Sequence, residues 1–465
     1  MDESCHSLAR IEKTAGIINK AGARLYFIGI GGVSMSALAL LCKANGAEIC
    51  GSDASRSCTT ELLSKQQIEV HVGHRAENIA AFLPDAVIFS LAISQDNPEM
   101  KEAIRLGIPL IRRSELLGAH LAAYDTSVCV SGSHGKSTTV AMLTSIFSEA
   151  GLSPTALCGA DLINGLGVLF GSREYIIAEA CEYGGSFLDM HASLSVMLNL
   201  ELDHTDCYRT LDEIKSAFIA AANASERVLI NADDQALLSI IPHISARTVT
   251  VSSHLGTDYT YIPCEYAPGR WRLILLRGND EIVRCELAVP GRYNLANAAM
   301  AAAAADLCGV SAGAVGRALS SFGGIGRRLE LLRRVGETDV YYDYAHHPSE
   351  IAAVYSALSS LGYGKICTVF SPHTYSRTEA FFSEFQKELS RFDKVFLTEI
   401  YAAREPYRDT VSATLLGAAI NASGGNCSPA TASAVINYIN EEKPSCIVLM
   451  GAGELREIKQ AIEDF

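Results

Sequence analysis

The stretch Val128-Cys129-Val130-Ser131-Gly132-Ser133-His134-Gly135-Lys136-Ser137-Thr138-Thr139 decides how this chain is interpreted. An apolar run leads into a short turn, and the apolar spacing of residues 140–147 then predicts a helix. This strand–loop–helix order is typical of phosphate-binding loops, because glycines let the backbone approach an anion and the first helical N–H groups point at it. In such a loop Lys136 reaches the β- and γ-phosphates of a nucleotide, and the Ser137 hydroxyl binds Mg²⁺. The longer form of the motif carries one more glycine, where Val130 stands, so an ordinary glycine-rich turn is the alternative.

Length and composition limit the classes of function. The chain has 465 residues, which predicts two to four domains, and a net charge of −14 that disfavours wrapping around nucleic acid. Its 14 cysteines include no Cys-x-x-Cys pair, which is typical of reduced thiols in the cytosol. No apolar run reaches transmembrane length, and the first residues lack the layout of a signal peptide. We therefore expect a cytoplasmic protein with no membrane and no nucleic-acid partner.

The first 120 residues predict a Rossmann-like unit. A strand at Arg24–Ile28 runs into the glycine turn Gly29–Ser34, a helix follows, and the next strand ends at Asp53, where a carboxylate binding a ribose or a base would lie. A serine replaces the third glycine of the dinucleotide fingerprint. On this turn alone, a nicotinamide dehydrogenase and a plain Rossmann turn fit equally well. Further strands are predicted at Ala86–Ser90 and Pro109–Ile111.

Two strand ends in the central part of the chain carry candidate metal ligands. Glu179 follows the predicted strand Tyr175–Ala178, and His204 follows the predicted strand Ser195–Leu200. In parallel α/β sheets the carboxyl ends of strands meet at one edge, so both side chains are expected beside the phosphate loop. Carboxylate oxygen suits Mg²⁺, and imidazole suits a second, softer or transient site. A solvated carboxylate and a hydrogen-bonded loop histidine are the alternatives.

The rest of the central part predicts a change of architecture. Residues 222–230 predict another strand, and residues 245–290 predict a small antiparallel insert. An alanine-rich helix then starts near Pro290. Asn294 and Asn297 on this helix could read the edge of an adenine, because an amide offers both a donor and an acceptor, whereas capping of the helix is an equally good explanation of Asn294.

The last part of the chain predicts a third parallel sheet. Strand signals at residues 340–342, 365–370, 394–397 and 446–450 are each followed by a polar loop. Those loops gather His346, His373 and Arg377, a set suited to a carboxylate or phosphate, although each residue alone is more often a surface residue. The predicted fold class is therefore α/β with three domains, each on a mainly parallel sheet: residues 1–120, 121–325 and 326–465.

Taken in this order, the motifs resemble those of the Mur ligases of peptidoglycan synthesis, over essentially the whole chain. The residues that carry the resemblance are Gly29–Gly32, Gly51–Asp53, Gly132–Thr138, Glu179–Glu182, Leu202–His204, Pro290–Asn294, Arg327–Arg328, Asp343–Pro348 and Pro372–Thr378. The chain departs from the usual family pattern at Ser133 and Ser137 (usually Thr), Tyr293 (usually His), Cys181 (usually Asp) and Ser34-Met35-Ser36 (usually Gly-Met-Gly).

The resemblance implies substrates and site residues. ATP and Mg²⁺ would be the cofactors, UDP-N-acetylmuramate and L-alanine the partners, and the protein a monomer or a homodimer. The UDP-sugar would bind at Gly29, Gly31, Gly32, Asp53 and Ser90. ATP would bind at Gly132, Ser133, His134, Gly135, Lys136, Ser137, Thr138, Asn294, Asn297, Arg327, Arg328 and Asp343. The metal ligands would be Ser137, Glu179 and His204, and the amino acid would lie at His346, His373 and Arg377. The residues acting in catalysis would be Lys136, Glu179, His204, His346 and Arg377.

The implied activity is ATP-dependent formation of an amide from the lactyl carboxylate of the UDP-sugar, through an acyl phosphate. Three alternatives stay open at this point. One is a recycling ligase of the same family, which attaches a murein tripeptide to the same UDP-sugar. The second is a phosphate-loop ATPase that is not coupled to amide formation, and the third is a nucleotide-binding regulatory protein without turnover.

Overall fold

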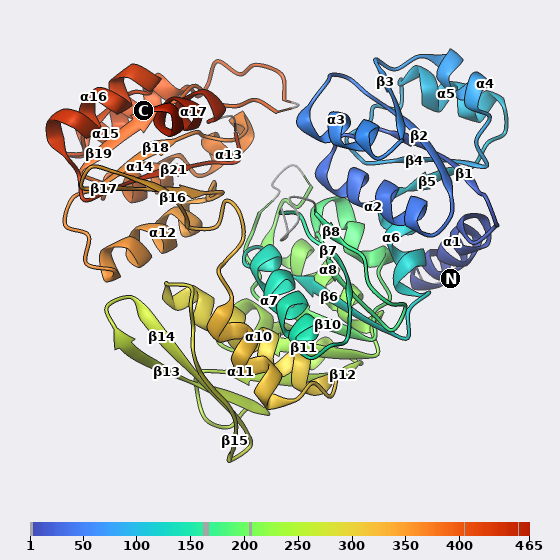
Figure 1. Ribbon diagram of the computed structural model, residues 1–465, viewed down its shortest axis with the longest axis horizontal. Coiled ribbons are helices and arrows are strands. Elements are labelled where there is room, and N and C mark those ends of the chain that lie inside the picture. Colours follow the sequence, from blue (N-terminus) through green and yellow to red (C-terminus); the bar gives the residue numbers. More distant parts are fainter. Residues whose placement is uncertain (1–2, 161–166, 204–206, 404, 454) are drawn as a thin grey trace.

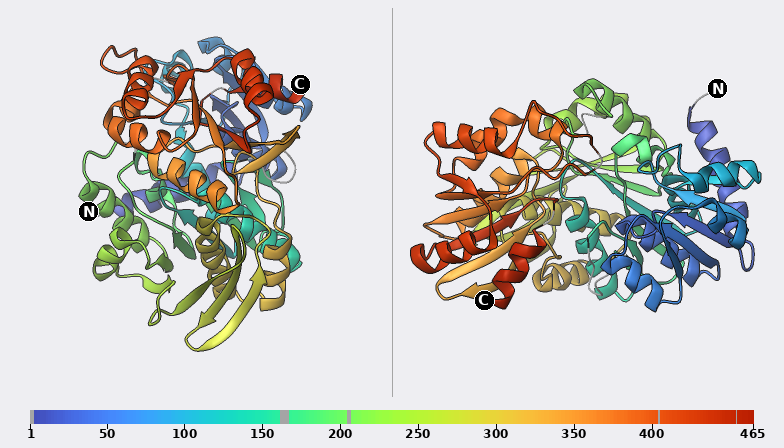
Figure 2. Two further views of the ribbon diagram at one scale, coloured as in Figure 1. Left: turned by 90° about the vertical axis from the view of Figure 1, so that its left-hand side faces the viewer. Right: turned by 90° about the horizontal axis from the view of Figure 1, so that it is seen from above.

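The computed structural model describes residues 3–160, 167–203, 207–403, 405–453 and 455–465. The molecule consists of three lobes, each built around one sheet (Figure 1). The N-terminal lobe and the C-terminal lobe both border the central lobe, and the view from above in Figure 2 shows them at opposite ends of the molecule. The predicted α/β class with three mainly parallel sheets is confirmed.

The N-terminal lobe is a parallel sheet in the order β3-β2-β1-β4-β5. The strands predicted at residues 24–28, 86–90 and 109–111 are present, whereas β3 was not predicted, because its alternation of charged and apolar residues is short. The elements are β1 (Arg24–Ile28), β2 (Glu48–Asp53), β3 (Glu69–Val72), β4 (Ala86–Phe89) and β5 (Leu110–Arg112), with α1 (Glu3–Ile18), α2 (Val33–Ala44), α3 (Cys58–Lys65), α4 (Ala76–Phe82), α5 (Pro98–Arg105) and α6 (Arg113–Leu121).

The central lobe is one ten-stranded sheet in the order β15-β14-β13-β12-β11-β10-β6-β9-β7-β8. Its strands are β6 (Thr126–Ser131), β7 (Thr155–Leu157), β8 (Val168–Leu169), β9 (Tyr175–Glu179), β10 (Leu194–Met197), β11 (Arg227–Asn231), β12 (Arg247–Ser252), β13 (Tyr259–Ala267), β14 (Arg270–Arg277) and β15 (Asp280–Glu286). Its helices are α7 (Lys136–Glu149), α8 (Leu211–Asn223), α9 (Gln235–Ile240), α10 (Arg292–Leu307) and α11 (Ala312–Ser321), with the 3₁₀ turns η1 (Tyr183–Asp189) and η2 (Ile241–His243).

Two predictions for this lobe need correction. Residues 222 and 223 end helix α8, which Thr210 caps by accepting a hydrogen bond from the Glu213 N–H, so the strand starts only at Arg227. The segment predicted as a small antiparallel insert continues the main sheet, and only its last three strands pair antiparallel. Strand β12 pairs parallel with β11 and β13 pairs parallel with β12, whereas the pairs β13–β14 and β14–β15 are antiparallel. The open edge of β12 offers unpaired backbone groups, so further strands extend the sheet rather than form a second one.

The C-terminal lobe has a six-stranded sheet in the order β16-β17-β21-β18-β19-β20. It is parallel except that β16 runs antiparallel to β17 as a hairpin. The elements are β16 (Glu330–Val335), β17 (Thr338–Asp343), β18 (Ile366–Phe370), β19 (Lys394–Leu397), β20 (Cys427–Pro429) and β21 (Cys446–Met450), with α12 (Pro348–Ser360), α13 (Tyr375–Ala380), α14 (Phe382–Leu389), α15 (Ala413–Ala422), α16 (Ala432–Glu442) and α17 (Arg456–Asp464).

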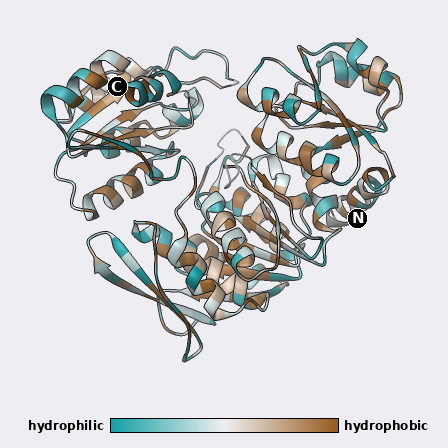
Figure 3. Cartoon of the chain, viewed as in Figure 1, coloured by the Kyte–Doolittle hydropathy of each residue, from teal (hydrophilic) through white to brown (hydrophobic). Residues whose placement is uncertain are grey.

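Hydrophobic residues concentrate on the strands and on the helix faces turned toward them, and polar residues lie outside (Figure 3). This burial on both faces of the sheets explains why the parallel strands are near-continuous apolar runs. Within the described ranges, every helix is too short or too polar to cross a lipid bilayer. The predicted phosphate loop and Glu179 lie at the carboxyl ends of the central strands β6 and β9.

Candidate active site

The phosphate loop has the predicted geometry. Strand β6 ends at Ser131, and helix α7 begins at Lys136. Gly135 has a φ of 85°, and a Cβ atom there would lie 2.5 Å from the Asn297 Oδ1 atom, so only glycine fits between the loop and helix α10. Helix α7 thus begins directly at this loop, and the first N–H groups of a helix, which have no partner within the helix, suit an anion.

Lys136 forms a buried ion pair at this loop. Its Nζ atom lies 3.1 and 3.3 Å from the carboxylate oxygens of Glu182, and it also donates to the Gly132 carbonyl. Burial by itself lowers the pKa of Lys136, but Glu182 and, more weakly, Glu179 outweigh it and raise the pKa above its usual value. Lys136 is thus held as a cation. Glu182, whose side chain is fully buried, was not predicted as a site residue, although it lies only three positions after Glu179.

Glu179 ends strand β9, the immediate neighbour of β6, so the sheet brings it to the phosphate loop as predicted. Its Oε1 atom accepts hydrogen bonds from the Gly159 N–H at 2.6 Å and from the Cys158 thiol at 3.1 Å. Ser137 is buried in the first turn of α7. A hydroxyl and a carboxylate are oxygen donors of the kind that Mg²⁺ prefers, so these two residues fit the predicted metal. His204 lies outside the described residues.

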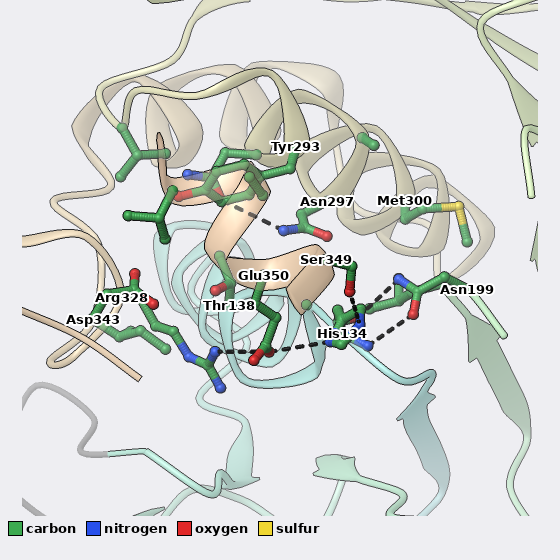
Figure 4. A pocket seen from close by; sticks show the side chains of 18 of the residues that line it. His134, Thr138, Asn199, Tyr293, Asn297, Met300, Arg328, Asp343, Ser349 and Glu350 are labelled. Atoms are coloured by element: carbon green, nitrogen blue, oxygen red, sulfur yellow. Dashed lines mark hydrogen bonds and ion pairs between the residues drawn. The ribbon is translucent and has the colours of Figure 1, made fainter. Parts of the chain in front are cut away.

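A cavity of about 270 Å³ lies between the phosphate loop, helix α10 and the start of helix α12 (Figure 4). Asn294 and Asn297 both line it, and their amides are linked at 3.4 Å. The Asn294 amide also donates to the Pro290 carbonyl at 2.7 Å. Asn294 therefore bonds the backbone at the start of helix α10 and also lines the cavity. The other lining residues include Thr138, Leu198, Asn231, Val289, Tyr293, Met300, Phe322, Ile325, Arg328, Asp343 and Glu350. A mostly apolar pocket with a few amides and charges beside a phosphate loop suits a nucleoside.

Arg327 and Arg328, at the start of the C-terminal lobe, direct their side chains to different parts of the structure. Arg328 lines the cavity, with its guanidinium 3.9 Å from Glu350. Arg327 has a φ of 60°, which turns its side chain over the rings of Tyr342 and Tyr344, where it donates to the Gly451 carbonyl at 3.2 Å. Arg327 is therefore not among the residues that line the cavity, and its place at the nucleotide stays a prediction.

Asp343 also lines the cavity, at the end of strand β17. Its carboxylate accepts hydrogen bonds from the N–H groups of Leu329 at 2.6 Å and Ala345 at 2.7 Å. Burial raises the pKa of Asp343 to about 6, against the lowering effect of Arg328. Asp343 thus holds the backbone at Leu329 and Ala345 in place, and it also lines the cavity.

A second, partly buried network joins the phosphate loop to the C-terminal lobe, and we call it the His134 cluster: His134, Glu201, Ser349 and Glu350. The His134 Nδ1 atom lies 3.1 Å from Glu350, and its Nε2 atom lies 2.9 Å from the Ser349 hydroxyl and 3.3 Å from Glu201 (Figure 4). Burial lowers the pKa of His134, but Glu350 and Glu201 outweigh it and raise the pKa to about 10. His134 is therefore an imidazolium that links two lobes. The three partners were not predicted.

His346, His373 and Arg377 come together as predicted. The rings of the two histidines are 5.9 Å apart, and Arg377 donates to the His373 Nδ1 atom at 3.0 Å. Arg377 also forms a buried ion pair with Asp203 of the central lobe at 2.9 Å. Burial lowers the pKa of His346 to about 4, so its imidazole is neutral. Its Nδ1 atom bonds the Tyr344 carbonyl at 2.9 Å, which places the proton on Nδ1 and leaves Nε2 as an acceptor.

The glycine turn of the N-terminal lobe is tied to Asp53. The Gly31 N–H donates to the Asp53 carboxylate at 2.9 Å, and a Cβ atom on Gly31 would lie 2.8 Å from the same oxygen. The Gly29 N–H bonds the Ser52 carbonyl at 2.8 Å, and Gly32 directly precedes helix α2. Ser90 lies, half-buried, just after strand β4. The predicted residues therefore share the carboxyl edge of this sheet, with Asp53 already bonded to the turn.

Family models identify the chain. The Mur ligase catalytic domain matches residues 24–125, the Mur ligase middle domain matches residues 130–305, and the Mur ligase glutamate ligase domain matches residues 327–453. The chain belongs to the Mur ligase family. Two similar proteins of this family are the UDP-N-acetylmuramate–L-alanine ligases of Caldicellulosiruptor bescii and Acetivibrio thermocellus. The first is 38% identical and the match covers 82% of this chain and 85% of the relative; the second is 37% identical over 93% and 94%.

Solved structures agree with the fold of this Mur ligase. The UDP-N-acetylmuramate–alanine ligase of Thermotoga maritima superposes with a TM-score of 0.80 at 25% identity, over 95% of this chain and 98% of that chain. A murein peptide ligase of Psychrobacter arcticus superposes with a TM-score of 0.70 at 20% identity, over 96% and 99% of the two chains, which shows the shared fold.

Two departures from the family pattern have visible partners in this Mur ligase. Ser34 stands where the family usually has glycine, and its hydroxyl accepts a hydrogen bond from Arg113 at 3.0 Å. Cys181 stands where the family usually has aspartate. Burial raises the pKa of this thiol, as does Glu182, so the position is neutral and Glu182 is the carboxylate that pairs with Lys136.

Proposed function

We propose that this Mur ligase joins L-alanine to the lactyl carboxylate of UDP-N-acetylmuramate, with cleavage of ATP to ADP and phosphate, in peptidoglycan precursor synthesis. The proposal is supported by relatives of that name that are 38% and 37% identical over most of the chain. The observation that carries it is structural. A phosphate loop with a buried lysine and a strand-end carboxylate lie at the carboxyl edge of the central sheet, and a nucleoside-sized cavity between that loop and the C-terminal lobe lies beside them.

ATP binds with its phosphates on the loop Gly132–Thr138 and its adenosine in the cavity. Asn294 and Asn297 offer amide donors and acceptors to the base, and Arg328 and Asp343 lie on the side of the C-terminal lobe. Mg²⁺, held by Ser137 and Glu179, would neutralise part of the negative charge of the phosphates.

The first step makes an acyl phosphate. A lactyl carboxylate oxygen attacks the γ-phosphorus, the bond from that phosphorus to the bridging β–γ oxygen breaks, and ADP leaves with the electron pair. Lys136, kept as a cation by Glu182, and the helix start behind it stabilise the charge of the transferring group. Lys136 must exchange part of its contact with Glu182 for the phosphate oxygens when the nucleotide binds.

The second step forms the amide. The amine of alanine attacks the acyl carbon, phosphate leaves, and the ammonium proton must be removed. His346 is neutral and its Nε2 atom can accept a hydrogen bond from the attacking amine, while its lowered pKa makes it a weak base, so the proton passes on to solvent. Arg377 and His373 next to it provide donors for the carboxylate of alanine.

The residue ranges of the prediction fit these roles. We assign residues 1–120 to the UDP-sugar, with Gly29, Gly31, Gly32, Asp53 and Ser90 at the carboxyl edge of the first sheet. Residues 121–325 bind the ATP phosphates, and residues 326–465 complete the nucleotide site and bind the amino acid. We propose a cytoplasmic location, because the proposed substrates are a water-soluble nucleotide-sugar and a free amino acid.

Phosphate release tests the proposal. The protein is incubated with ATP, Mg²⁺ and UDP-N-acetylmuramate, and L-alanine, L-serine, glycine and the murein tripeptide are added one at a time. We expect phosphate and a new UDP-linked product only when the UDP-sugar and a small amino acid are both present, with L-alanine the best acceptor. Turnover with the tripeptide but not with alanine would indicate the recycling ligase. ATP hydrolysis in the absence of both the UDP-sugar and an amino acid would contradict the proposed reaction.

A further inference from the structure

Three metal-binding side chains lie together on the N-terminal lobe, away from the phosphate loop. Cys50 is on strand β2, and Glu69 and His71 are on the edge strand β3 beside it. The parallel register pairs Cys50 with Glu69 and Ser52 with His71, so the three side chains leave the same face of the sheet. One sulfur, one carboxylate oxygen and one imidazole nitrogen of these residues all lie within 4.8 Å of one another.

The spacing of these atoms suits a tetrahedral metal. The Cys50 Sγ atom is 3.6 Å from the His71 Nε2 atom, and the Glu69 Oε1 atom is 3.8 Å from the same nitrogen. Bonds of about 2.3 Å to sulfur and about 2.0 Å to nitrogen place two tetrahedral ligands about 3.5 Å apart. A zinc ion between these atoms therefore requires only a small rotation of the Glu69 side chain, which is largely exposed.

The surroundings of the thiol are negative. Burial raises the pKa of Cys50 to about 12, and Glu69, Glu99 and Glu48 add to that rise. The same charges that disfavour a bare thiolate favour a divalent cation beside it, since the cation balances the thiolate and the carboxylates together. Binding breaks the S–H bond, forms a metal–sulfur bond and releases the proton to solvent.

We propose that Cys50, Glu69 and His71 form a zinc site on the edge of the N-terminal lobe, separate from the magnesium ligands of the phosphate loop. Three protein ligands leave the fourth position for water, because the Glu69 and His71 side chains are 74% and 32% exposed. Such an open site exchanges its metal, unlike a closed structural site. The metal links the edge strand β3 to β2. Close to it, Ser52 on β2 and His74 just after β3 are both hydrogen-bonded to the buried carboxylate of Glu99.

The other three-ligand group found among the described residues is His134, Glu201 and His347. The Ser349 hydroxyl lies 2.9, 3.1 and 2.7 Å from the ligand atoms of these three residues, so hydrogen bonds already fill its centre. It also contains no thiol. These differences favour the Cys50 group as the zinc site and make the two groups distinguishable by spectroscopy.

Cobalt(II) is the probe, because a cysteine thiolate bound to it gives a charge-transfer band in the near ultraviolet that imidazole and carboxylate ligands do not give. The metal-free full-length protein is titrated with Co²⁺ in the presence of Mg²⁺. We expect the band to saturate near one equivalent and to disappear when Zn²⁺ is added, because zinc binds such sites more tightly than cobalt.

Two variants and one control assign the ligands. Cys50→Ser removes the band, and His71→Gln, at a partly exposed position, weakens Co²⁺ binding at least about 100-fold, since even loss of a residue behind a ligand weakens binding 10- to 100-fold. Cys58→Ser, an exposed cysteine on the next helix, leaves the band unchanged. Absence of the band at ten equivalents of Co²⁺ in the unmodified protein, or a band that survives both Cys50→Ser and His71→Gln, would overturn the site. Ligase turnover with Mg²⁺ is measured separately and is expected to persist in both variants.

Discussion

Glu350→Gln is the most direct test of the charge assigned to His134. The substitution keeps the shape of the side chain and removes the carboxylate that lies 3.1 Å from the His134 Nδ1 atom. Glu350 is the largest of the effects that raise the pKa of His134 from 6.5 to about 10. If it supplies about half of the rise, the pKa of His134 in the variant is about 8.

The sign of the effect on stability follows from the raised pKa. A histidine with a raised pKa stabilises the fold fully below its unfolded pKa of 6.5, and that contribution is lost as the pH rises through the folded pKa. In the unmodified protein the contribution is lost between about pH 6.5 and pH 10, and in Glu350→Gln between about pH 6.5 and pH 8. The variant should therefore be less stable by about 2 kcal/mol at pH 8, with the difference falling below about 1 kcal/mol at pH 10.

Nuclear magnetic resonance of ¹³C-labelled histidine measures the pKa directly. Ser349→Ala is the matched control, because it removes the hydroxyl on the Nε2 side and leaves both carboxylates, so the pKa of His134 should stay near 10. Urea unfolding at pH 8 and pH 10 then tests the stability. If His134 of the unmodified protein titrates near 6.5, or if Glu350→Gln leaves its pKa where it was, the charged link between the lobes does not exist.

Four further substitutions test the rest of the site. Lys136→Ala should lower ligase turnover at least about 100-fold while UDP-sugar binding, followed by calorimetry, is kept, and a variant retaining a tenth of the rate would contradict the role of this lysine. Arg328→Ala should weaken ATP binding about 10-fold, whereas Arg327→Ala should not, and equal effects would mean that both side chains reach the nucleotide. Asp203→Asn breaks the buried pair with Arg377, so it should lower stability by about 3 kcal/mol in urea unfolding and raise the KM for alanine, and an unchanged KM would separate that pair from the amino-acid site.

The parts of the site that the sequence predicts are local. The phosphate loop, the strand at Arg24–Ile28 and Glu179 at a strand end each depend on a few neighbouring residues whose spacing fixes their conformation. The rule that parallel strands end at one edge then places Glu179 beside Lys136 without any knowledge of distant contacts. These predictions are confirmed because periodicity and turn chemistry determine them.

The parts that the sequence does not predict depend on distance along the chain or on a single backbone angle. Residues 134 and 350 are 216 positions apart, and no local pattern at either one indicates the other. Arg327 and Arg328 are adjacent and chemically identical, and only the positive φ of the first separates their directions. The strands of residues 245–290 were predicted as strands, but the pairing of the first of them, β12, with β11 depends on which edge is free, which is a property of the assembled sheet.

Helix α12 begins at Pro348, and its first turn forms part of the wall of the nucleoside cavity as well as most of the contact with His134. Release of ADP and movement of the C-terminal lobe away from the central lobe would therefore break contacts of the same helical turn. A substitution that weakens these contacts should speed up both events, so the rate of ADP release would report the rate of the lobe movement.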